Sequence, residues 1–248
     1  MHHEREPDED PSSSPSRDET DWSSVGRIGR AGAATERSER VLINYWLAAH
    51  SYLMALVNRD EELANELSDE FALRFLRGDF SKATPEKGRF RDYIKAVLRN
   101  LVAEHFRKQT ARARHSERVD FENLSNERIE AEFLDNLRSA IVASAMQRLA
   151  LFQKDHGTPY YTALQLRSSH PDASMARLAR LLTQQTKQPY ATDYLRQIIH
   201  RARERLASFV VERVRNACRC ATAEELREEL HSLQLWESCK DFVDLDEI

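Results

Sequence analysis

The sequence predicts an all-α protein made of two helical domains joined by a charged linker. Only six glycines occur in 248 residues, and no Gly or Pro occurs between Arg89 and His156 or from Tyr190 to the end. Both tracts are rich in Ala, Leu, Arg and Glu, which are strong helix formers. A chain of this length can bury one large core or two small ones, which allows two domains.

The N-terminal part divides into an acidic tail, residues 1–21, and a first helical domain, residues 22–108. The tail holds eight acids against two arginines, with several Pro and Ser residues. It buries too little apolar surface to offset the entropy of ordering it, so we expect disorder. From Ser38 to Val57 the chain is apolar on nearly every face, which predicts a buried central helix.

An amphipathic helix is predicted next, from Glu61 to Arg77. Its apolar positions recur every four residues, at Leu63, Leu67, Phe71 and Phe75. This stripe leaves an acidic face formed by Glu62, Glu66, Asp69 and Glu70. The following segment, Gly78 to Gly88, contains Pro85 and is predicted to be a loop.

A basic helix is predicted from about Phe90 to Arg107. Between Lys87 and Arg118 the chain carries ten Lys and Arg against three acids, although its formal net charge is −4. Cations can follow a phosphate backbone and aromatic rings can stack on unpaired bases, which favours single-stranded or melted nucleic acid as a ligand. The alternative is that the aromatic rings face the core and the cations are simply solvated.

The charged, weakly periodic segment 109–132 is interpreted as the linker, and a second helical domain as residues 133–221. Within this domain, residues 173–182 and 192–206 predict a helix-turn-helix. Thr192 is a suitable N-cap, and the exposed face of the second helix would carry Arg196, Gln197, His200, Arg201 and Arg203. Arg and Gln can form paired hydrogen bonds to base edges in the major groove. The alternative is an ordinary helical hairpin with a solvated basic face.

The C-terminal extension, residues 222–248, holds nine acids against Arg227 and Lys240. Its apolar positions predict a packed helical cap: Leu226, Leu230, Leu233, Leu235 and Trp236. The alternative is an autoinhibitory segment that shields the basic helices from DNA.

The sequence gives no sign of a catalytic, metal or membrane-spanning site. No GxSxG or HExxH motif occurs, so we expect neither enzyme activity nor a cofactor. Cys218, Cys220, His231 and Cys239 are zinc-ligand types, but they include only one close pair, and reduced thiols are the favoured interpretation. The most apolar run, Val41 to Val57, is short for a membrane span. An odd number of cysteines and no signal peptide predict a cytoplasmic protein.

Four stretches together resemble the extracytoplasmic-function (ECF) group of bacterial RNA polymerase sigma factors. They are Trp22-Ser-Ser-Val25 with the Tyr45-Trp46 helix, ELSDEFALRFL from Glu66, GRFRDYIKAVLRNLVAEHFRK from Gly88, and YLRQIIHRARERL from Tyr194. The third is similar to F-R-x-W-L-x-x-x-x-R-N-x-x-x-D-x-x-R, with Tyr93 for Trp and Glu104 for Asp. In the second, Glu66 and Asp69 replace the Asp and Gln of the family pattern D-L-x-Q-E-x-F.

The resemblance implies a sigma factor that binds polymerase core and directs promoter recognition. Residues 22–108 would form sigma domain two and residues 133–221 sigma domain four, with the linker passing near the RNA exit path. The melted minus-ten element would contact Lys82, Lys87, Arg89, Arg91, Tyr93, Lys95, Arg99, Asn100, Arg107 and Lys108. The minus-thirty-five duplex would contact Thr192, Arg196, Gln197, His200, Arg201 and Arg203.

The implied partners are bacterial RNA polymerase core and promoter DNA, and the resemblance also allows an anti-sigma factor. Polymerase would meet the acidic helix at Glu62, Glu66, Asp69, Glu70 and Phe71. One alternative is a sigma-derived DNA-binding regulator that no longer binds core, which the changes at Glu66 and Asp69 make credible. Another is an all-α protein-interaction module whose basic faces bind acidic partners. Such a module would lack salt-dependent DNA binding.

Overall fold

The computed structural model describes residues 32–77, 79, 89–112 and 127–245, with side chains described from residue 41 onward except those of 110–112. The all-α prediction is confirmed, because these residues contain helices and no strand. The helices are α1 (Gly32–Leu56), α2 (Glu61–Leu76), α3 (Phe90–Arg112), α4 (Glu127–His156), α5 (Tyr160–Ser169), α6 (Met175–Thr186), α7 (Thr192–Cys218), α8 (Ala223–Ser232) and α9 (Trp236–Cys239). The predicted tail 1–21 and most of the loop 78–88 lie outside this range.

Local sequence signals fix several helix ends. The Asp60 carboxylate accepts a hydrogen bond from the backbone N–H of Leu63 at 3.0 Å and caps α2. At α8, Thr222 and Glu225 form a reciprocal capping box. The predicted N-cap at Thr192 is wrong by one residue, because the first helical hydrogen bond runs from Leu195 to the carbonyl of Ala191.

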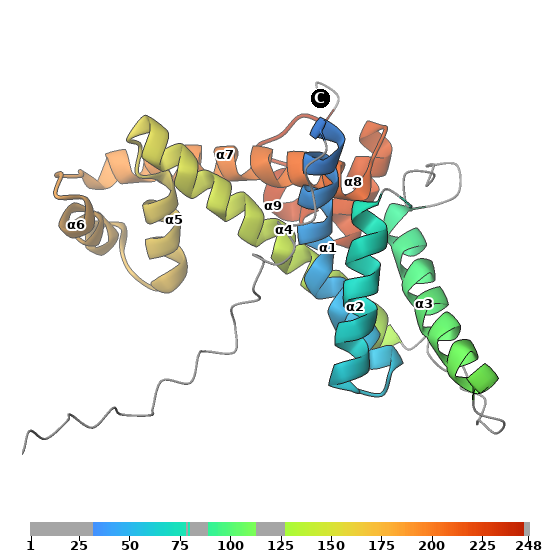
Figure 1. Cartoon of the computed structure of the whole chain (residues 1–248). Helices are drawn as coiled ribbons and strands as arrows, with labels where there is room; N and C mark the ends of the chain where they lie inside the picture. The colour runs from blue at the N-terminus through green and yellow to red at the C-terminus, as the bar shows by residue number, and fades with distance from the viewer. Residues whose placement is uncertain (1–31, 78, 80–88, 113–126, 246–248) are drawn as a thin grey trace, which may run out of the picture.

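The larger of two hydrophobic cores surrounds α1, which packs against α2, α3, α4 and α7 (Figure 1). Aromatic rings connect its parts. The Tyr52 and Phe133 ring centroids lie 5.6 Å apart, and those of Tyr45 and Phe90 lie 5.7 Å apart. The expected burial of this helix on nearly every face is corrected at Ile43 and Leu47, whose side chains are about half exposed.

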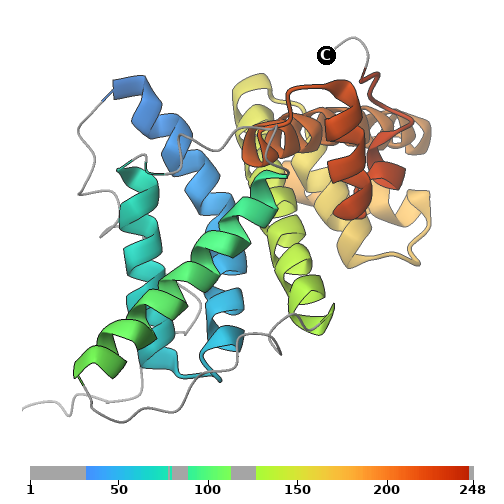
Figure 2. The same ribbon diagram turned by 90° about the vertical axis from the view of Figure 1, so that its right-hand side faces the viewer.

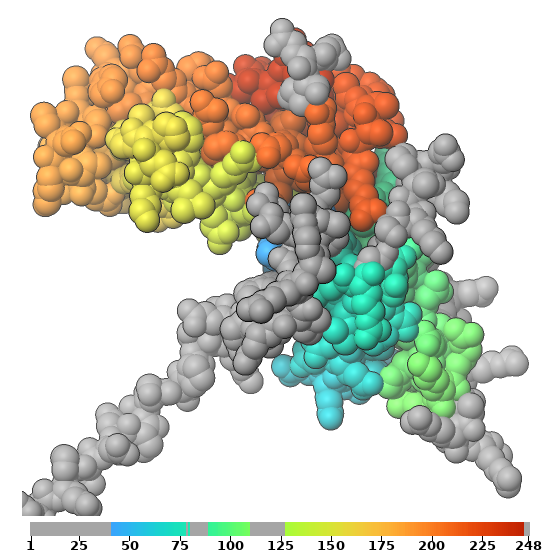
Figure 3. Space-filling model, turned by 45° about the horizontal axis from the view of Figure 1, so that its top comes forward, coloured from blue at the N-terminus to red at the C-terminus, as the bar shows by residue number. Residues whose placement is uncertain are grey.

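The smaller core joins α5, α6 and the N-terminal half of α7. The C-terminal half of α7 belongs to the larger core, together with α8 and α9. Helix α7 therefore connects the two cores. Figure 2 shows the α1–α3 layer on one side of α4 and the C-terminal helices on the other. In Figure 3 the α6–α7 end and the α2–α3 end project in different directions.

The predicted division into two domains does not coincide with these two cores. Residues 127–132, expected in the linker, form the first part of α4. Helix α4 packs along α1 and places Phe133, Leu137 and Ile141 in the larger core. Two hydrogen bonds join the first part of α4 to α1: Ser51 donates to the Glu132 carboxylate at 2.7 Å, and Tyr52 donates to Glu130 at 3.4 Å. Together with Ile129, which packs against the larger core, these pairings hold the segment against α1.

Candidate nucleic-acid interface

The N-terminal half of α7 presents a basic face beside α6. Leu195, Ile198 and Ile199 are buried in the smaller core, where they meet Leu178 and Leu182 of α6. The opposite face carries the exposed side chains expected from the sequence: Arg196, Gln197, His200, Arg201 and Arg203. Thr192 is partly buried at the start of the helix.

The turn between α6 and α7 is held by its own hydrogen bonds. Lys187 ends α6 in the left-handed conformation, with a φ of 61°. The backbone N–H of Tyr190 then donates to the Thr183 hydroxyl at 3.1 Å. A short helix is thereby packed across the start of a longer one, and the turn needs no glycine.

Two residues of the α7 face have neighbours within the chain. Arg196 forms an ion pair with Asp193, one helical turn earlier, and its side chain remains 60% exposed. The His200 ring lies 5.6 Å from the ring of Phe242, which belongs to the C-terminal extension. Both side chains are therefore at the surface but are not isolated.

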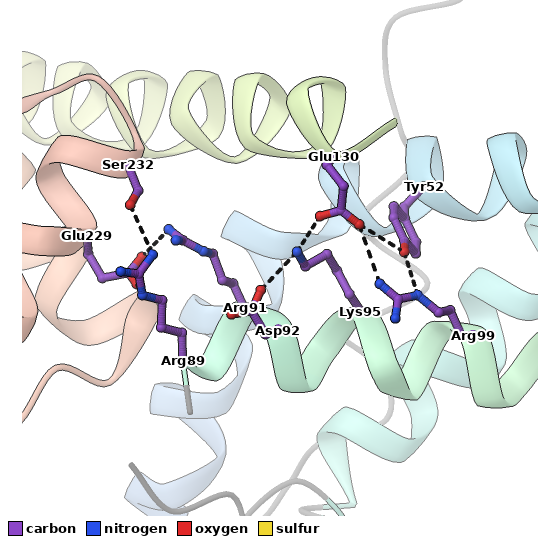
Figure 4. Close-up of polar contacts among 9 residues, drawn as sticks. All are labelled: Tyr52, Arg89, Arg91, Asp92, Lys95, Arg99, Glu130, Glu229 and Ser232. Carbon is purple, nitrogen blue, oxygen red and sulfur yellow. Dashed lines mark hydrogen bonds and ion pairs between the residues drawn. The ribbon is translucent and has the colours of Figure 1, made fainter. Parts of the chain in front are cut away.

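The second basic face lies on α3, where four cations project toward other helices (Figure 4). At the start of the helix, Arg89 donates to Glu228 of α8 at 2.9 Å and to the Ser232 hydroxyl at 3.2 Å. Arg91 donates to Glu229 of α8 at 2.6 Å. The N-terminal end of α3 is thus joined to α8 by charge-assisted hydrogen bonds.

Further along α3, two cations converge on Glu130 at the start of α4 (Figure 4). Lys95 donates to Glu130 and forms an ion pair with Asp92 at 2.9 Å. Arg99 donates to the Tyr52 hydroxyl at 2.8 Å and to Glu130 at 3.4 Å. These contacts connect α3 with α4 and α1.

Burial separates these four cations into two kinds. Arg91 and Lys95 are only 6% and 8% exposed, whereas Arg89 and Arg99 are exposed. Desolvation lowers the pKa of Lys95, but the hydrogen bonds to Glu130 and Asp92 outweigh it and leave this pKa raised. Burial raises the pKa of Glu229, although the neighbouring guanidinium groups lower it. The cost of desolvation therefore exceeds the attraction to Arg91 and Arg89.

The remaining predicted minus-ten residues lie in different surroundings. Asn100, Arg107 and Lys108 are exposed on the C-terminal half of α3. Tyr93 is partly buried, with its ring stacked 6.3 Å from that of Phe90. Lys82 and Lys87 lie outside the described residues.

The acidic face of α2 lies where the four-residue spacing of its apolar positions predicted it. Glu62, Glu66 and Asp69 are exposed, while Glu70 is partly buried and pairs with Arg74 at 2.6 Å. Phe71 is different, because it is fully buried in the larger core, 5.8 Å from the ring of Phe75. In this conformation its side chain holds α2 in place and offers no surface to a partner.

Glu104 links α3 to α2, and its pKa gives a pH-dependent prediction. Hydrogen bonds from Lys108 and Arg74 lower the pKa of this carboxyl to about 2. A carboxyl with a depressed folded-state pKa adds stability above its unfolded pKa and loses it as the pH falls toward the folded value. We expect Glu104→Gln to destabilise the protein near neutral pH, with the difference from the wild type closing between about pH 4.5 and 2. Urea unfolding across this range measures it, and a difference independent of pH would contradict the assignment.

All three cysteines, Cys218, Cys220 and Cys239, are free thiols. Burial raises the pKa of Cys220 to about 12 and that of Cys239 to about 11, and the Tyr45 hydroxyl lies 3.9 Å from the buried Cys218 sulfur. Protonated thiols are poor metal ligands. Among the described residues, no group of three or more His, Cys, Asp and Glu side chains is placed to hold a metal ion.

The carboxylates that bind the α3 cations were not predicted from the sequence. Glu130 lies 35 residues from Lys95, and Glu229 lies 138 residues from Arg91. No local pattern pairs residues so far apart, and shielding of the basic helices by the C-terminal extension was only the alternative to a packed helical cap.

Comparisons with protein-family models, with curated proteins and with solved structures found no match to this chain. Of the helices in the described part, none has the length and apolar character needed to cross a membrane.

Proposed function

We propose that this protein is a sigma factor of the ECF type, which binds RNA polymerase core and directs it to promoters. The observation that carries the proposal is the basic face of α7, displayed beside α6 in a helix-turn-helix arrangement. A helix of this kind can enter the major groove while the preceding helix crosses the DNA backbone. Arg196, Gln197 and Arg201 have the side-chain chemistry that reads base edges or holds phosphates.

The minus-ten element would be held by α3. Its C-terminal half offers Asn100, Arg107 and Lys108 at the surface, and Arg99 extends this row toward the start of the helix. Arg91 and Lys95 are buried, so their contribution would be to position α3 unless the surrounding helices move. Strand binding by such a row depends on salt, because phosphate contacts release counterions.

The polymerase would meet α2. Glu62, Glu66 and Asp69 form an exposed acidic face that is suited to a basic surface on the polymerase clamp. Phe71 would support this face from within the core.

A second candidate is a sigma-derived DNA-binding regulator that does not bind polymerase. It is favoured by Glu66 and Asp69, since both are exposed at positions where the family pattern has Asp and Gln. Binding to polymerase core separates the two functions.

The α7 assignment predicts that Arg196→Ala and Arg201→Ala each weaken promoter use by about 1–3 kcal/mol. Both side chains are exposed, so neither change should lower the melting temperature appreciably. Transcription from a mapped promoter, with polymerase core and each variant, gives the measurement. Lys154→Ala on α4, which removes an exposed charge outside the α6–α7 pair, is the control. Wild-type promoter use by both arginine variants would remove this helix from the proposal.

A further inference from the structure

The C-terminal extension contacts both candidate nucleic-acid faces. Glu228 and Glu229 of α8 bind the N-terminal end of α3, and Phe242 lies against His200 of α7. A single segment that follows both basic blocks in sequence therefore folds back onto each of them.

Helix α8 is anchored independently of these polar contacts. Leu226 and Leu230 are fully buried in the larger core, and Leu233 is nearly so. The Thr222–Glu225 capping box fixes its first turn. Helix α8 therefore packs on the larger core as the predicted helical cap. This packing holds the carboxylates of Glu228 and Glu229 opposite the start of α3.

The contact at Arg89 has the chemistry of a phosphate contact. A guanidinium donates to carboxylate and phosphate oxygens with the same geometry, so the two anions compete for it. The side chains of Arg89 and Glu228 are 41% and 53% exposed, which allows exchange at the surface. The Arg91–Glu229 pair beneath them is buried, with side chains 7% and 5% exposed, and it would remain in place during such an exchange.

We infer that Glu228 of α8 is an internal competitor of nucleic-acid phosphate at Arg89, so that the C-terminal extension lowers the affinity of α3 for a single strand. This inference rests on the proposed function, in which α3 holds the melted minus-ten strand. Arg89 stands immediately before α3 and is exposed, as Arg99, Arg107 and Lys108 are on that helix. A bound strand would displace the Glu228 carboxylate without unfolding α8, because the leucines and the buried pair hold the helix.

The test compares Glu228→Gln with Glu224→Gln in the full-length chain. Both remove one negative charge from α8, but Glu224 bonds Arg227 on its own helix instead of α3. We expect Glu228→Gln to tighten binding of a labelled single-stranded oligonucleotide by about two- to five-fold, as the loss of one exposed ion pair allows, and Glu224→Gln to change it less. In an Arg89→Ala background, Glu228→Gln should give no further gain.

Equal gains from both glutamine variants, or a gain that persists without Arg89, would show a general charge effect and overturn the inference. An unchanged oligonucleotide affinity in Glu228→Gln would also overturn the inference. If wild-type chain binds promoter duplex in an Arg201-dependent way while Glu228→Gln brings no gain, only the inference fails. If neither the wild-type chain nor any variant binds the single-stranded oligonucleotide or the promoter duplex at moderate salt, both the inference and the proposed function fail.

Discussion

Replacing Arg91 by methionine is expected to destabilise the fold by about 3–5 kcal/mol, because it leaves Glu229 buried without its main cationic partner. The two groups are joined at 2.6 Å and their side chains are 7% and 5% exposed. Burial already raises the pKa of Glu229 while Arg91 is present. Chemical unfolding of the variant at neutral pH measures the loss.

Two further variants make this prediction specific. Arg89→Met removes an exposed cation from the same end of α3 and should cost at most about 1 kcal/mol. The double variant Arg91→Met/Glu229→Leu replaces the buried pair by apolar groups and should recover most of the lost stability. Equal, small losses for Arg89→Met and Arg91→Met would contradict a buried pair at this position.

The Arg91→Met loss should also shrink as the pH falls. Because the pKa of Glu229 is raised in the folded protein, the resulting loss of stability grows as the pH rises from the ordinary carboxyl pKa toward the folded-state value, and it disappears below the ordinary pKa. Without Arg91 the pKa should rise further. Unfolding at about pH 4.5 and pH 7, near and well above the ordinary carboxyl pKa, should therefore give a smaller difference from the wild type at the lower pH.

Phe133→Ala is expected to destabilise the protein by about 3–5 kcal/mol, as large-to-small changes in a close-packed core do. Phe133 is 1% exposed, and its ring lies 5.6 Å from that of Tyr52 and 6.3 Å from that of Tyr45 on α1. Lys95 Nζ lies 5.9 Å from the centre of the same ring. Thermal or urea unfolding gives the measurement.

The conservative variant Phe133→Leu retains most of the apolar volume and should cost less than Phe133→Ala. A loss below about 1 kcal/mol in Phe133→Ala would indicate a surface position. That result would contradict the packing of α4 along α1, on which the larger core depends.

Helix signals in this chain are strong, and they predicted much of the fold. The four-residue spacing of Leu67, Phe71 and Phe75 gave the buried face of α2, and all three are buried. The absence of Gly and Pro from the long tracts indicated α3, α4 and α7. The apolar face of the C-terminal extension predicted that Leu226 and Leu230 would be buried.

What the sequence could not give are contacts between distant segments. Residues 127–132, interpreted as linker, form the first part of α4, and hydrogen bonds from Ser51 and Tyr52 join them to α1. A pattern read along the chain does not show these contacts. The burial of Arg91 and Lys95 has the same origin. Each is paired with a carboxylate from another helix, and a pattern read along α3 shows only that they are basic.

In the candidate site, the exposed residues of α7 were predicted better than those of α3, because distant segments cover part of α3. On α7 the buried residues Leu195, Ile198 and Ile199 follow the helical period and lie on one face. The spacing along the sequence was therefore enough to predict which polar residues are exposed on the other face. On α3 the exposed set is smaller than predicted, since α4 and α8 cover its N-terminal half. Phe71 followed the apolar stripe of α2, which places it in the core.

Binding to bacterial RNA polymerase core tests the proposed sigma function most directly. Purified chain and core would be mixed at moderate salt and analysed by size-exclusion chromatography. The prediction is co-elution, weakened by Glu62→Lys and Glu66→Lys on the acidic face of α2 and unchanged by Glu224→Lys on α8. Separate elution of the wild-type chain and core, with promoter DNA binding intact, would contradict a sigma function and leave a DNA-binding regulator.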